Sequence, residues 1–189
     1  MSERPIAAGK SSFDLVDSQK VFAELLLEEK TSFLDLACGT GMYALGAAGL
    51  IGEGGRVYAI DLWEEGIDAL KQEVARLGLK NLSPLLGDVS RRIPLDERSI
   101  DVCLMATVLH DLIEDGAAVE TMVEVVRVLK PGGRLAVVEF RKVEGPPGPP
   151  ASVRLTPEDT EEFLRPFGFR KTGLSDVGPY NYLMTFALE

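Results

Sequence analysis

The sequence contains few residues that bind metals and no apolar run long enough to cross a bilayer. Two cysteines, Cys38 and Cys103, and one histidine, His110, occur in its 189 residues. A closed zinc shell would need carboxylates as well, so no metal is expected. Each cysteine lies in an apolar stretch without C-x-x-C spacing, which is typical of small buried side chains in a reducing compartment and predicts a cytoplasmic protein. The apolar runs fall short of about 18 residues, and the first residues lack the apolar centre of a signal peptide, so no membrane span is expected.

Positive charge is also scarce. The chain has 20 Lys and Arg against 30 Asp and Glu, a net charge of −10, and the basic residues are scattered in ones and twos. An anionic surface without a basic patch repels phosphate backbones, so a nucleic-acid partner is not expected. The composition, 46% hydrophobic and 26% charged, is that of a globular protein, and the length predicts one domain over residues 1–189. A monomer and a homodimer both remain open.

Helix-like and strand-like segments alternate along the chain. Residues 1–30 form an N-terminal segment with one expected helix, which starts behind a cap at Asp17 or Ser18 and carries apolar residues at helical spacing: Val21, Phe22, Leu25 and Leu26. The core, residues 31–189, is expected to contain strands at 33–37, 56–60, 82–86, 100–106, 134–140, 169–174 and 182–188. Helices are expected at 42–51, 64–78 and 115–129, and from 157 onward behind the cap Thr156.

This alternation with short connections predicts an α/β protein, a three-layer α/β/α sandwich around a mostly parallel sheet. In such sheets ligands bind outside the carboxyl ends of the strands, beside the first strand. The segment FLDLACGTGMYAL, residues 33–45, lies at that point. Gly39 and Gly41 supply the backbone freedom that a tight strand-to-helix turn needs.

Two kinds of ligand are compatible with this turn. GTGMYA matches the G-x-G-x-x-A pattern of dinucleotide-binding folds, and Asp61 follows at a suitable distance to bind a ribose, although this match alone is weak. Carboxylates favour another ligand, because Asp35 lies within the first strand, Asp61 ends the second and Asp88 ends the third. Asp35 would organise the turn or bond an ammonium group, Asp61 would accept from two ribose hydroxyls, and Asp88 would accept from an adenine amine or belong to an ordinary turn. Such a set suits a pyrophosphate poorly.

Five stretches together closely resemble the class I S-adenosylmethionine-dependent methyltransferases: FLDLACGTG, VYAIDLW, GDV, IDVCLMATVLHDL and VVRVLKPGGRLAVVEF. The resemblance is closest to small bacterial and archaeal methyltransferase-domain proteins related to the quinone-biosynthesis methyltransferases, and it runs from about Phe33 to the end. It implies a Rossmann-like sheet of seven strands in the order 3-2-1-4-5-7-6, with strand 7 antiparallel. Ala37 stands where many members have the first glycine of the loop, a common replacement.

The resemblance implies S-adenosylmethionine as cofactor, S-adenosylhomocysteine as product and no metal. It implies that the glycine turn holds the amino-acid part of the cofactor, with the adenine between apolar side chains such as Leu62 and Val89, and Trp63 either there or elsewhere as a packing residue. The implied cofactor-binding set is Asp35, Ala37, Cys38, Gly39, Thr40, Gly41, Asp61, Leu62, Gly87, Asp88, Val89, Ala106, Thr107 and Leu109.

Three features on the acceptor side stay open. The position of His110 faces the transferable methyl group in the resembled family, so this residue is either a general base or a neutral ring that packs behind the pocket. The proline loop EGPPGPP, residues 144–150, is either a lid or a connector. Residues 11–13 precede the first helix and would reach over the cofactor if they fold back.

The expected function is methyl transfer to an unidentified small-molecule acceptor, because the chain leaves little room for a separate recognition domain. A sulfonium methyl is already reactive, so the site must supply alignment more than acid–base chemistry. The alternatives are a non-catalytic protein that binds S-adenosylmethionine or S-adenosylhomocysteine, and an NAD(P)-dependent oxidoreductase, against which Asp35 and Asp88 argue.

Overall fold

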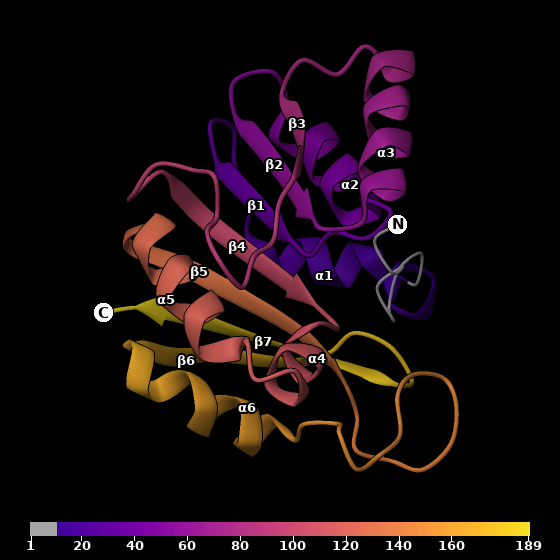
Figure 1. Cartoon of the computed structure of the whole chain (residues 1–189), viewed down its shortest axis with the longest axis vertical. Coiled ribbons are helices and arrows are strands. Elements are labelled where there is room, and N and C mark those ends of the chain that lie inside the picture. Colours follow the sequence, from indigo (N-terminus) through magenta and orange to yellow (C-terminus); the bar gives the residue numbers. More distant parts are fainter. Residues whose placement is uncertain (1–10) are drawn as a thin grey trace.

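The computed structural model describes residues 11–189, which form a seven-stranded sheet with helices on both faces (Figure 1). The strands are β1 (Ser32–Leu36), β2 (Arg56–Asp61), β3 (Leu82–Leu86), β4 (Ile100–Ala106), β5 (Leu129–Phe140), β6 (Phe169–Asp176) and β7 (Asn181–Leu188). The helices are α1 (Ser18–Leu25), α2 (Met42–Ile51), α3 (Glu64–Leu77), α4 (Leu109–Glu114), α5 (Ala118–Val128) and α6 (Pro157–Leu164), with short 3-10 turns η1 (Phe13–Leu15) and η2 (Arg165–Phe167). The first ten residues of the predicted N-terminal segment lie outside the described residues.

The sheet has the predicted topology. Its strands lie in the order β3-β2-β1-β4-β5-β7-β6, and β1 to β5 are parallel. β7 runs antiparallel to both β5 and β6. The α/β sandwich, the strand order and the antiparallel strand 7 are therefore confirmed. The chain moves outward from β1 to β2 on one side and to β4 on the other, which is the arrangement that opens a ligand crevice at the carboxyl ends.

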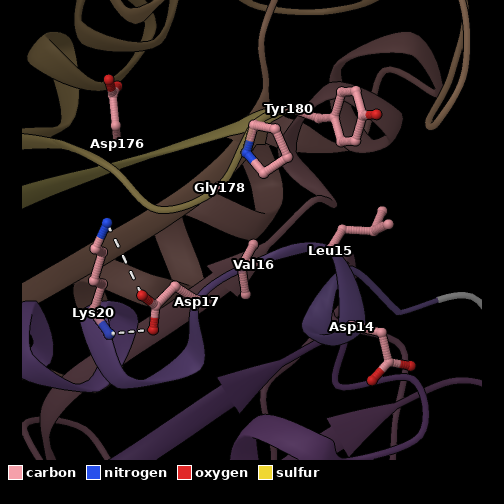
Figure 2. Close-up of a pocket in the computed structure, with 9 residues that line it drawn as sticks. Asp14, Leu15, Val16, Asp17, Lys20, Asp176, Gly178 and Tyr180 are labelled. Atoms are coloured by element: carbon pink, nitrogen blue, oxygen red, sulfur yellow. Dashed lines mark hydrogen bonds and ion pairs between the residues drawn. The ribbon is translucent and has the colours of Figure 1, made fainter.

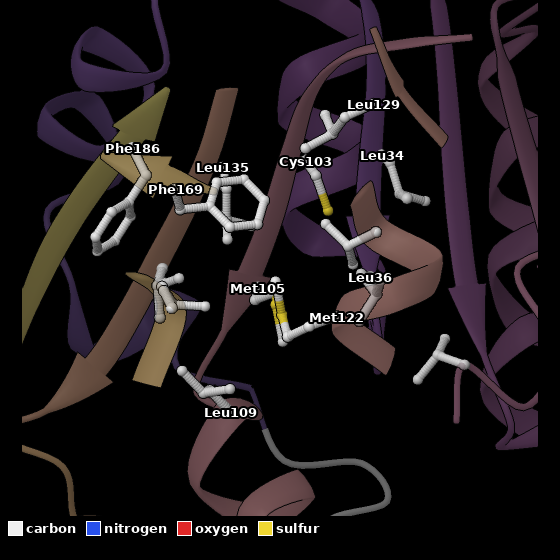
Figure 3. Packing of buried hydrophobic residues seen from close by; sticks show 14 of the residues in the cluster. Leu34, Leu36, Cys103, Met105, Leu109, Met122, Leu129, Leu135, Phe169 and Phe186 are labelled. Carbon is white, nitrogen blue, oxygen red and sulfur yellow. The ribbon is translucent and has the colours of Figure 1, made fainter. Parts of the chain in front are cut away.

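Two hydrophobic clusters fill the spaces between the sheet and its helices. One packs α1, α2 and α3 against one face, and the other packs α4, α5 and α6 against the opposite face. Figure 3 shows the second cluster, in which Met105 of β4 and Met122 of α5 both take part. Along β4, Cys103 and Met105 face this cluster while Val102 and Leu104 face the other. Because both faces of β4 are covered, its sequence is apolar from Val102 to Ala106.

Three local predictions were wrong. Leu26 was expected on the buried face of the first helix, but it is 63% exposed and ends α1 with a left-handed φ of 48°. The helix expected over 115–129 is α5, which begins only at Ala118, and a short helix that was not expected, α4, precedes it and is separated from it by Gly116 with a φ of 69°. β5 begins at Leu129 instead of Arg134, since the KPGG segment is part of the strand and the register with β4 shifts there.

The N-terminal segment packs against the rest of the described chain. The amide of Asp17, the N-cap of α1, donates to the carbonyl of Val177 (2.6 Å), and Val21 and Leu25 are buried in the same cluster as α2. That residues 1–189 form one domain stays a prediction. None of the helices within residues 11–189 has both the length and the apolar character that crossing a bilayer requires.

Candidate functional site

The turn from β1 to α2 is built from left-handed backbone conformations. Ala37, Gly39 and Gly41 have φ of 56°, 55° and 74°, and the Gly41 amide donates to the carbonyl of Cys38 (2.8 Å). A Cβ on Gly41 would also lie 2.4 Å from the side chain of Leu70 in α3. Gly41 is therefore required both by its backbone conformation and by the close approach of α3, whereas Ala37 shows that the turn accepts one other residue type.

Asp35 is buried in β1 and caps α2 from outside the helix. It is 1% exposed, and its Oδ2 accepts a hydrogen bond from the amide of Ala44 (3.0 Å). The N-cap of α2 is Gly41, which has no side chain for this purpose, so Asp35 supplies the acceptor. Burial raises the pKa of Asp35 from 3.8 to about 7, the Ala44 hydrogen bond opposes this, and the nearby charge of Asp61 adds to it. Asp35 thus binds the first turn of α2, and its predicted roles, to organise the glycine turn or to bond an ammonium group, stay predictions.

Asp61, the last residue of β2, joins the glycine turn to the connection between β2 and α3. Its Oδ2 accepts from the amide of Gly39 (2.7 Å), and its Oδ1 accepts from the amide of Trp63 (2.8 Å). Each carboxylate oxygen has room for a second hydrogen bond. Since Asp61 is only partly buried and the next residue, Leu62, is 51% exposed, the carboxylate is accessible to the hydroxyl groups of a ligand.

The acid at the end of β3 is engaged locally. The amide of Gly87 donates to the carbonyl of Asp61 (2.9 Å), which holds the end of β3 beside β2. Asp88 accepts from the amide two residues further along (3.0 Å) and pairs with Arg91 (3.1 Å). Val89 is 5% exposed and belongs to the core. Ordinary turn chemistry accounts for the contacts of Asp88 seen here, and a contact with adenine stays a prediction.

The turn after β4 carries the predicted residues Ala106, Thr107 and Leu109. Thr107 has a φ of 54°, its amide donates to the carbonyl of Val138 in β5 (2.7 Å), and its hydroxyl donates to the carbonyl of Ala106 (2.8 Å). Leu109 is fully buried in the core, so it supports the turn from behind. Ala106 and Thr107 are half-buried and remain within reach of a ligand.

His110, in the first turn of α4, is held by an acid that the sequence analysis missed. Its Nδ1 lies 2.8 Å from Oε2 of Glu139, and its Nε2 lies 3.3 Å from Oδ1 of Asp111. His110 is 4% exposed and Glu139 is 0% exposed. Burial lowers the pKa of His110, but the hydrogen bond and charge of Glu139, together with the charge of Asp111, outweigh burial and raise the pKa above 6.5. The signal that could have revealed Glu139 is an acid inside an otherwise apolar strand, AVVEF.

The proline loop after β5 is wound around Arg154, a second residue that the sequence analysis missed. Arg154 is 2% exposed. Its five N–H groups donate to five main-chain carbonyls of the loop, at 2.7 to 3.1 Å: those of Arg141, Val143, Gly145, Pro147 and Pro149. The guanidinium carbon also lies 5.5 Å from the centre of the Phe140 ring. The loop is therefore an internally hydrogen-bonded structure, and its role as a lid stays a prediction.

The N-terminal segment lies over the start of α2. The hydroxyl groups of Ser12 and Tyr43 share a hydrogen bond (3.1 Å), and the ring of Phe13 packs edge-on against Tyr43 (5.0 Å between centres). A hollow of about 610 Å³ lies beside this segment, between the η1–α1 region and the β6–β7 loop, and Figure 2 shows the residues that line it. Its lining includes Lys20 and Asp17, 4.0 Å apart, but no residue of the predicted cofactor set. The hollow thus lies outside the predicted cofactor site.

Comparison with known proteins decides the family. A family model described as a methyltransferase domain matches residues 27–165. The crystal structure of an S-adenosylmethionine-dependent methyltransferase from Aquifex aeolicus is 31% identical, with a TM-score of 0.85 over 94% of this chain and 93% of that chain. This chain belongs to the class I S-adenosylmethionine-dependent methyltransferase family.

Membership of this methyltransferase family does not by itself identify the reaction, as two other relatives show. The demethylmenaquinone methyltransferase of Bacillus mycoides (strain KBAB4) is 30% identical over 106 residues, which are 56% of this chain and 43% of that protein. The match thus spans less than half the length of that curated relative. The structure of the [4+2]-cyclase SpnF shares the fold at 21% identity, with a TM-score of 0.73 over 90% of this chain and 78% of that chain. Because one fold can serve different reactions, the acceptor has to be argued from the site.

Proposed function

We propose that this chain transfers a methyl group from S-adenosylmethionine to a small-molecule acceptor. The observation that carries the proposal is the position of the Asp61 carboxylate, which accepts from Gly39 of the glycine turn (2.7 Å) and from Trp63 beyond β2 (2.8 Å). These two bonds fix an accessible anion at the carboxyl edge of the sheet. A ribose suits this anion, because its two hydroxyl groups can each donate to one oxygen.

The remaining predicted residues are proposed to surround the same cofactor. The buried carboxylate of Asp35 beneath the glycine turn suits an ammonium group, since a positive charge there would offset the cost of burial. Leu62 and Asp88 border the proposed adenine position at the ends of β2 and β3. The half-buried residues after β4 would line the methionine chain: Ala106 and Thr107. The other members of the set would shape these turns: Ala37, Cys38, Gly39, Thr40, Gly41, Gly87, Val89 and Leu109.

The partners of the glycine turn support this cofactor over a dinucleotide. Dinucleotide folds bind a diphosphate with free main-chain amides of such a turn. Here the amides of Gly39 and Gly41 already donate to Asp61 and Cys38. Asp61, and Asp35 above its raised pKa, also add negative charge beside the turn, which would repel a diphosphate. These contacts weigh against an NAD(P)-dependent oxidoreductase.

When bound, S-adenosylmethionine supplies a methyl group that its positively charged sulfur makes reactive. The part left to the chain is to bind, to orient and to exclude water, and such alignment contributes up to about 7–11 kcal/mol in favourable cases. The turn after β4 is suited to orientation, because Thr107 is fixed by its amide bond to Val138 of β5 (2.7 Å). No acid or base is required for this chemistry if the acceptor atom has a free lone pair.

Isothermal titration with S-adenosylhomocysteine tests the binding half of the proposal, with NAD⁺ as the competing ligand. We expect Asp61→Ala to lose about 100-fold or more in affinity, because two hydrogen bonds to a charged group contribute about 1.5–3 kcal/mol each. The matched control is Asp68→Ala, which removes an exposed acid of α3 that pairs only with Lys71. Unchanged affinity in Asp61→Ala, or tighter binding of NAD⁺ than of S-adenosylhomocysteine, would defeat the proposal.

A ligand without the ribose hydroxyl groups separates a direct contact from a disturbed glycine turn. We expect 2′,3′-dideoxy S-adenosylhomocysteine to bind the native protein much more weakly than S-adenosylhomocysteine, and to bind Asp61→Ala about as weakly as S-adenosylhomocysteine does. If the two changes instead add, Asp61 acts only through the turn. Release of S-adenosylhomocysteine from S-adenosylmethionine in a screen of small metabolites then tests turnover, and binding without turnover would favour the non-catalytic alternative.

We further propose a cytoplasmic protein that works without nucleic acid, as a monomer or a homodimer. Cys38 and Cys103 are buried free thiols, which suits a reducing compartment. The net charge of −10 supports a partner other than nucleic acid. Light scattering after gel filtration gives the oligomeric state, and a mobility-shift assay with RNA and DNA checks the second expectation.

A further inference from the structure

The ring of His110 lies between two carboxylates. Nδ1 is 2.8 Å from Oε2 of Glu139 on β5, and Nε2 is 3.3 Å from Oδ1 of Asp111 on α4. Glu139 is fully buried, whereas the side chain of Asp111 is 37% exposed. Nδ1 therefore has a hydrogen-bond acceptor, and Nε2 lies within ion-pair distance of a second carboxylate.

This geometry favours two protons on the ring. A neutral imidazole has one N–H, so its second nitrogen would present a lone pair to the lone pairs of a carboxylate. Both contacts are attractive only when both nitrogens carry protons. Burial raises the pKa of Asp111 and the charge of His110 opposes this, but the ordinary pKa of His, 6.5, exceeds that of Asp, 3.8, so a proton shared between the two groups belongs on the ring. The arrangement is that of an imidazolium between two carboxylates.

Charges on the neighbouring elements support the same protonation state. Besides Asp111, α4 contributes the charge of Glu114, which adds to the raised pKa of His110. The Phe140 ring packs edge-on against His110 (6.3 Å between ring centres), and the guanidinium carbon of Arg154 lies 5.5 Å from the centre of that ring. Burial itself disfavours a charged ring and is outweighed by Glu139 and the acids of α4.

Glu139 also binds the backbone on both sides of the ring. Its Oε1 accepts from the amide of His110 (3.2 Å), and its Oε2 accepts from the amide of Phe140 (3.2 Å) in addition to the ring. Three residues earlier than His110, the amide of Thr107 donates to Val138, the neighbour of Glu139 in β5. Two successive residues of β5 thus hold the turn that follows β4.

We propose that His110 and Glu139 form a charged clamp that positions the β4–α4 turn against β5, and that His110 does not act as a general base. Glu139 is the positioning residue, since it acts on the turn through His110. The proposal rests on the proposed function, because the turn carries Ala106 and Thr107 of the predicted cofactor set. It also narrows the acceptor class to atoms with a free lone pair at neutral pH, such as an unprotonated nitrogen or a thiolate, since a doubly protonated ring accepts no proton.

The chain has one histidine, so NMR reads this ring without assignment. In the full-length ¹⁵N-labelled protein, a long-range ¹H–¹⁵N correlation should show both ring nitrogens in the imidazolium range at pH 6. The titration midpoint should lie above 6.5. A neutral tautomer at pH 6, or a midpoint at or below 6.5, would overturn the proposal. The measurement needs neither cofactor nor acceptor, so its outcome is independent of whether S-adenosylmethionine binds.

Three variants locate the cause of the shift. Glu139→Gln should move the midpoint below 6.5, because burial then prevails, and Asp111→Asn should move it in the same direction by less. Glu120→Gln removes the same unit of charge from an exposed position of α5 and should leave the midpoint unchanged. Equal midpoints in Asp111→Asn, Glu120→Gln and the native protein would contradict the clamp even if Glu139→Gln does not fold.

The pH dependence of stability gives a second measurement. A histidine whose pKa is raised by folding stabilises fully below its unfolded pKa near 6.5, and this contribution is lost as pH rises through the raised pKa. His110→Gln should therefore lose more stability relative to the native protein at pH 6 than at pH 9 in urea titrations. A loss that is equal at both pH values would indicate a purely packed, neutral ring.

Discussion

The two halves of the carboxyl edge of the sheet treat charge differently. At the ends of β2 and β3, Asp61 and Asp88 are partly buried, and their partners are backbone amides and a nearby arginine. At the ends of β4 and β5 and in the loop beyond, His110, Glu139 and Arg154 are 4%, 0% and 2% exposed. All five N–H donors of Arg154 and both carboxylate oxygens of Glu139 form hydrogen bonds within the protein. The first half keeps acceptor sites for a ligand, whereas the second half uses its charges to fix the walls around that ligand.

Asp35 is the exception to this difference, because it lies in the half with the accessible acids and yet is buried. The largest effect is expected at this residue. Its carboxyl is protonated in the folded protein up to about pH 7 but in the unfolded protein only below about 3.8. The stability of the native protein should therefore fall as pH rises from about 4 to 7 and change no further above that. Asp35→Asn keeps an oxygen for the amide of Ala44 and cannot titrate. In urea titrations, the free energy of unfolding of Asp35→Asn should rise relative to that of the native protein by an amount on the order of 4 kcal/mol as pH increases across this range. Parallel pH profiles would show that the buried carboxyl has an ordinary pKa.

The same variant shows whether Asp35 meets the ammonium group of the cofactor. If it does, the native protein should bind S-adenosylhomocysteine more tightly at pH 8 than at pH 6, because the charged carboxylate then has a partner. Asp35→Asn should lack this pH dependence. 5′-Methylthioadenosine, which has no amino-acid part, is the matched ligand and should show none with either protein. A pH effect that is equal for both ligands would assign Asp35 to the glycine turn alone.

The next largest effect is expected in the other half, at Arg154. Arg154→Met keeps an unbranched chain against Phe140 but removes the five donors that hold the loop. We expect a loss of about 2–3 kcal/mol in stability, since hydrogen bonds to a charged group contribute about that much and five carbonyls lose their partner. Hydrogen exchange should rise in residues 141–149, and the affinity for S-adenosylhomocysteine should stay the same. Arg165→Met, at an exposed position, is the control. Lost cofactor affinity in Arg154→Met would show that the two halves are not separate.

This contrast also explains what the sequence could predict. The strands, the glycine turn and the positions of Asp35 and Asp61 follow from local patterns, because each acid ends or interrupts an apolar run next to its partners. Glu139 also interrupts an apolar run, but its partner is distant in the sequence, and Arg154 carries no such mark. Glu139 is joined to His110 across 29 residues, and the donors of Arg154 reach carbonyls whose directions depend on the course of the loop. The short helix α4 was missed for a related reason, since the turn that separates it from α5 depends on a left-handed conformation at Gly116.

The smallest effect is expected at the N-terminus of α6, a helix that follows the loop around Arg154. Its cap is a local sequence motif, although the contacts around it could not be predicted from the sequence. Thr156 accepts from the amide of Asp159, and the carboxylate of Asp159 accepts from the amide of Thr156, so α6 starts with a capping box. Thr156→Ala should lose about 1 kcal/mol of stability, as removal of such a cap does in other helices. Glu162→Ala, at an exposed position of the same helix, should be close to neutral. A loss of stability near zero in Thr156→Ala would mean that the packing of its apolar face holds α6 in place. Even a helix whose start is marked in the sequence would then depend on contacts with residues distant in the chain.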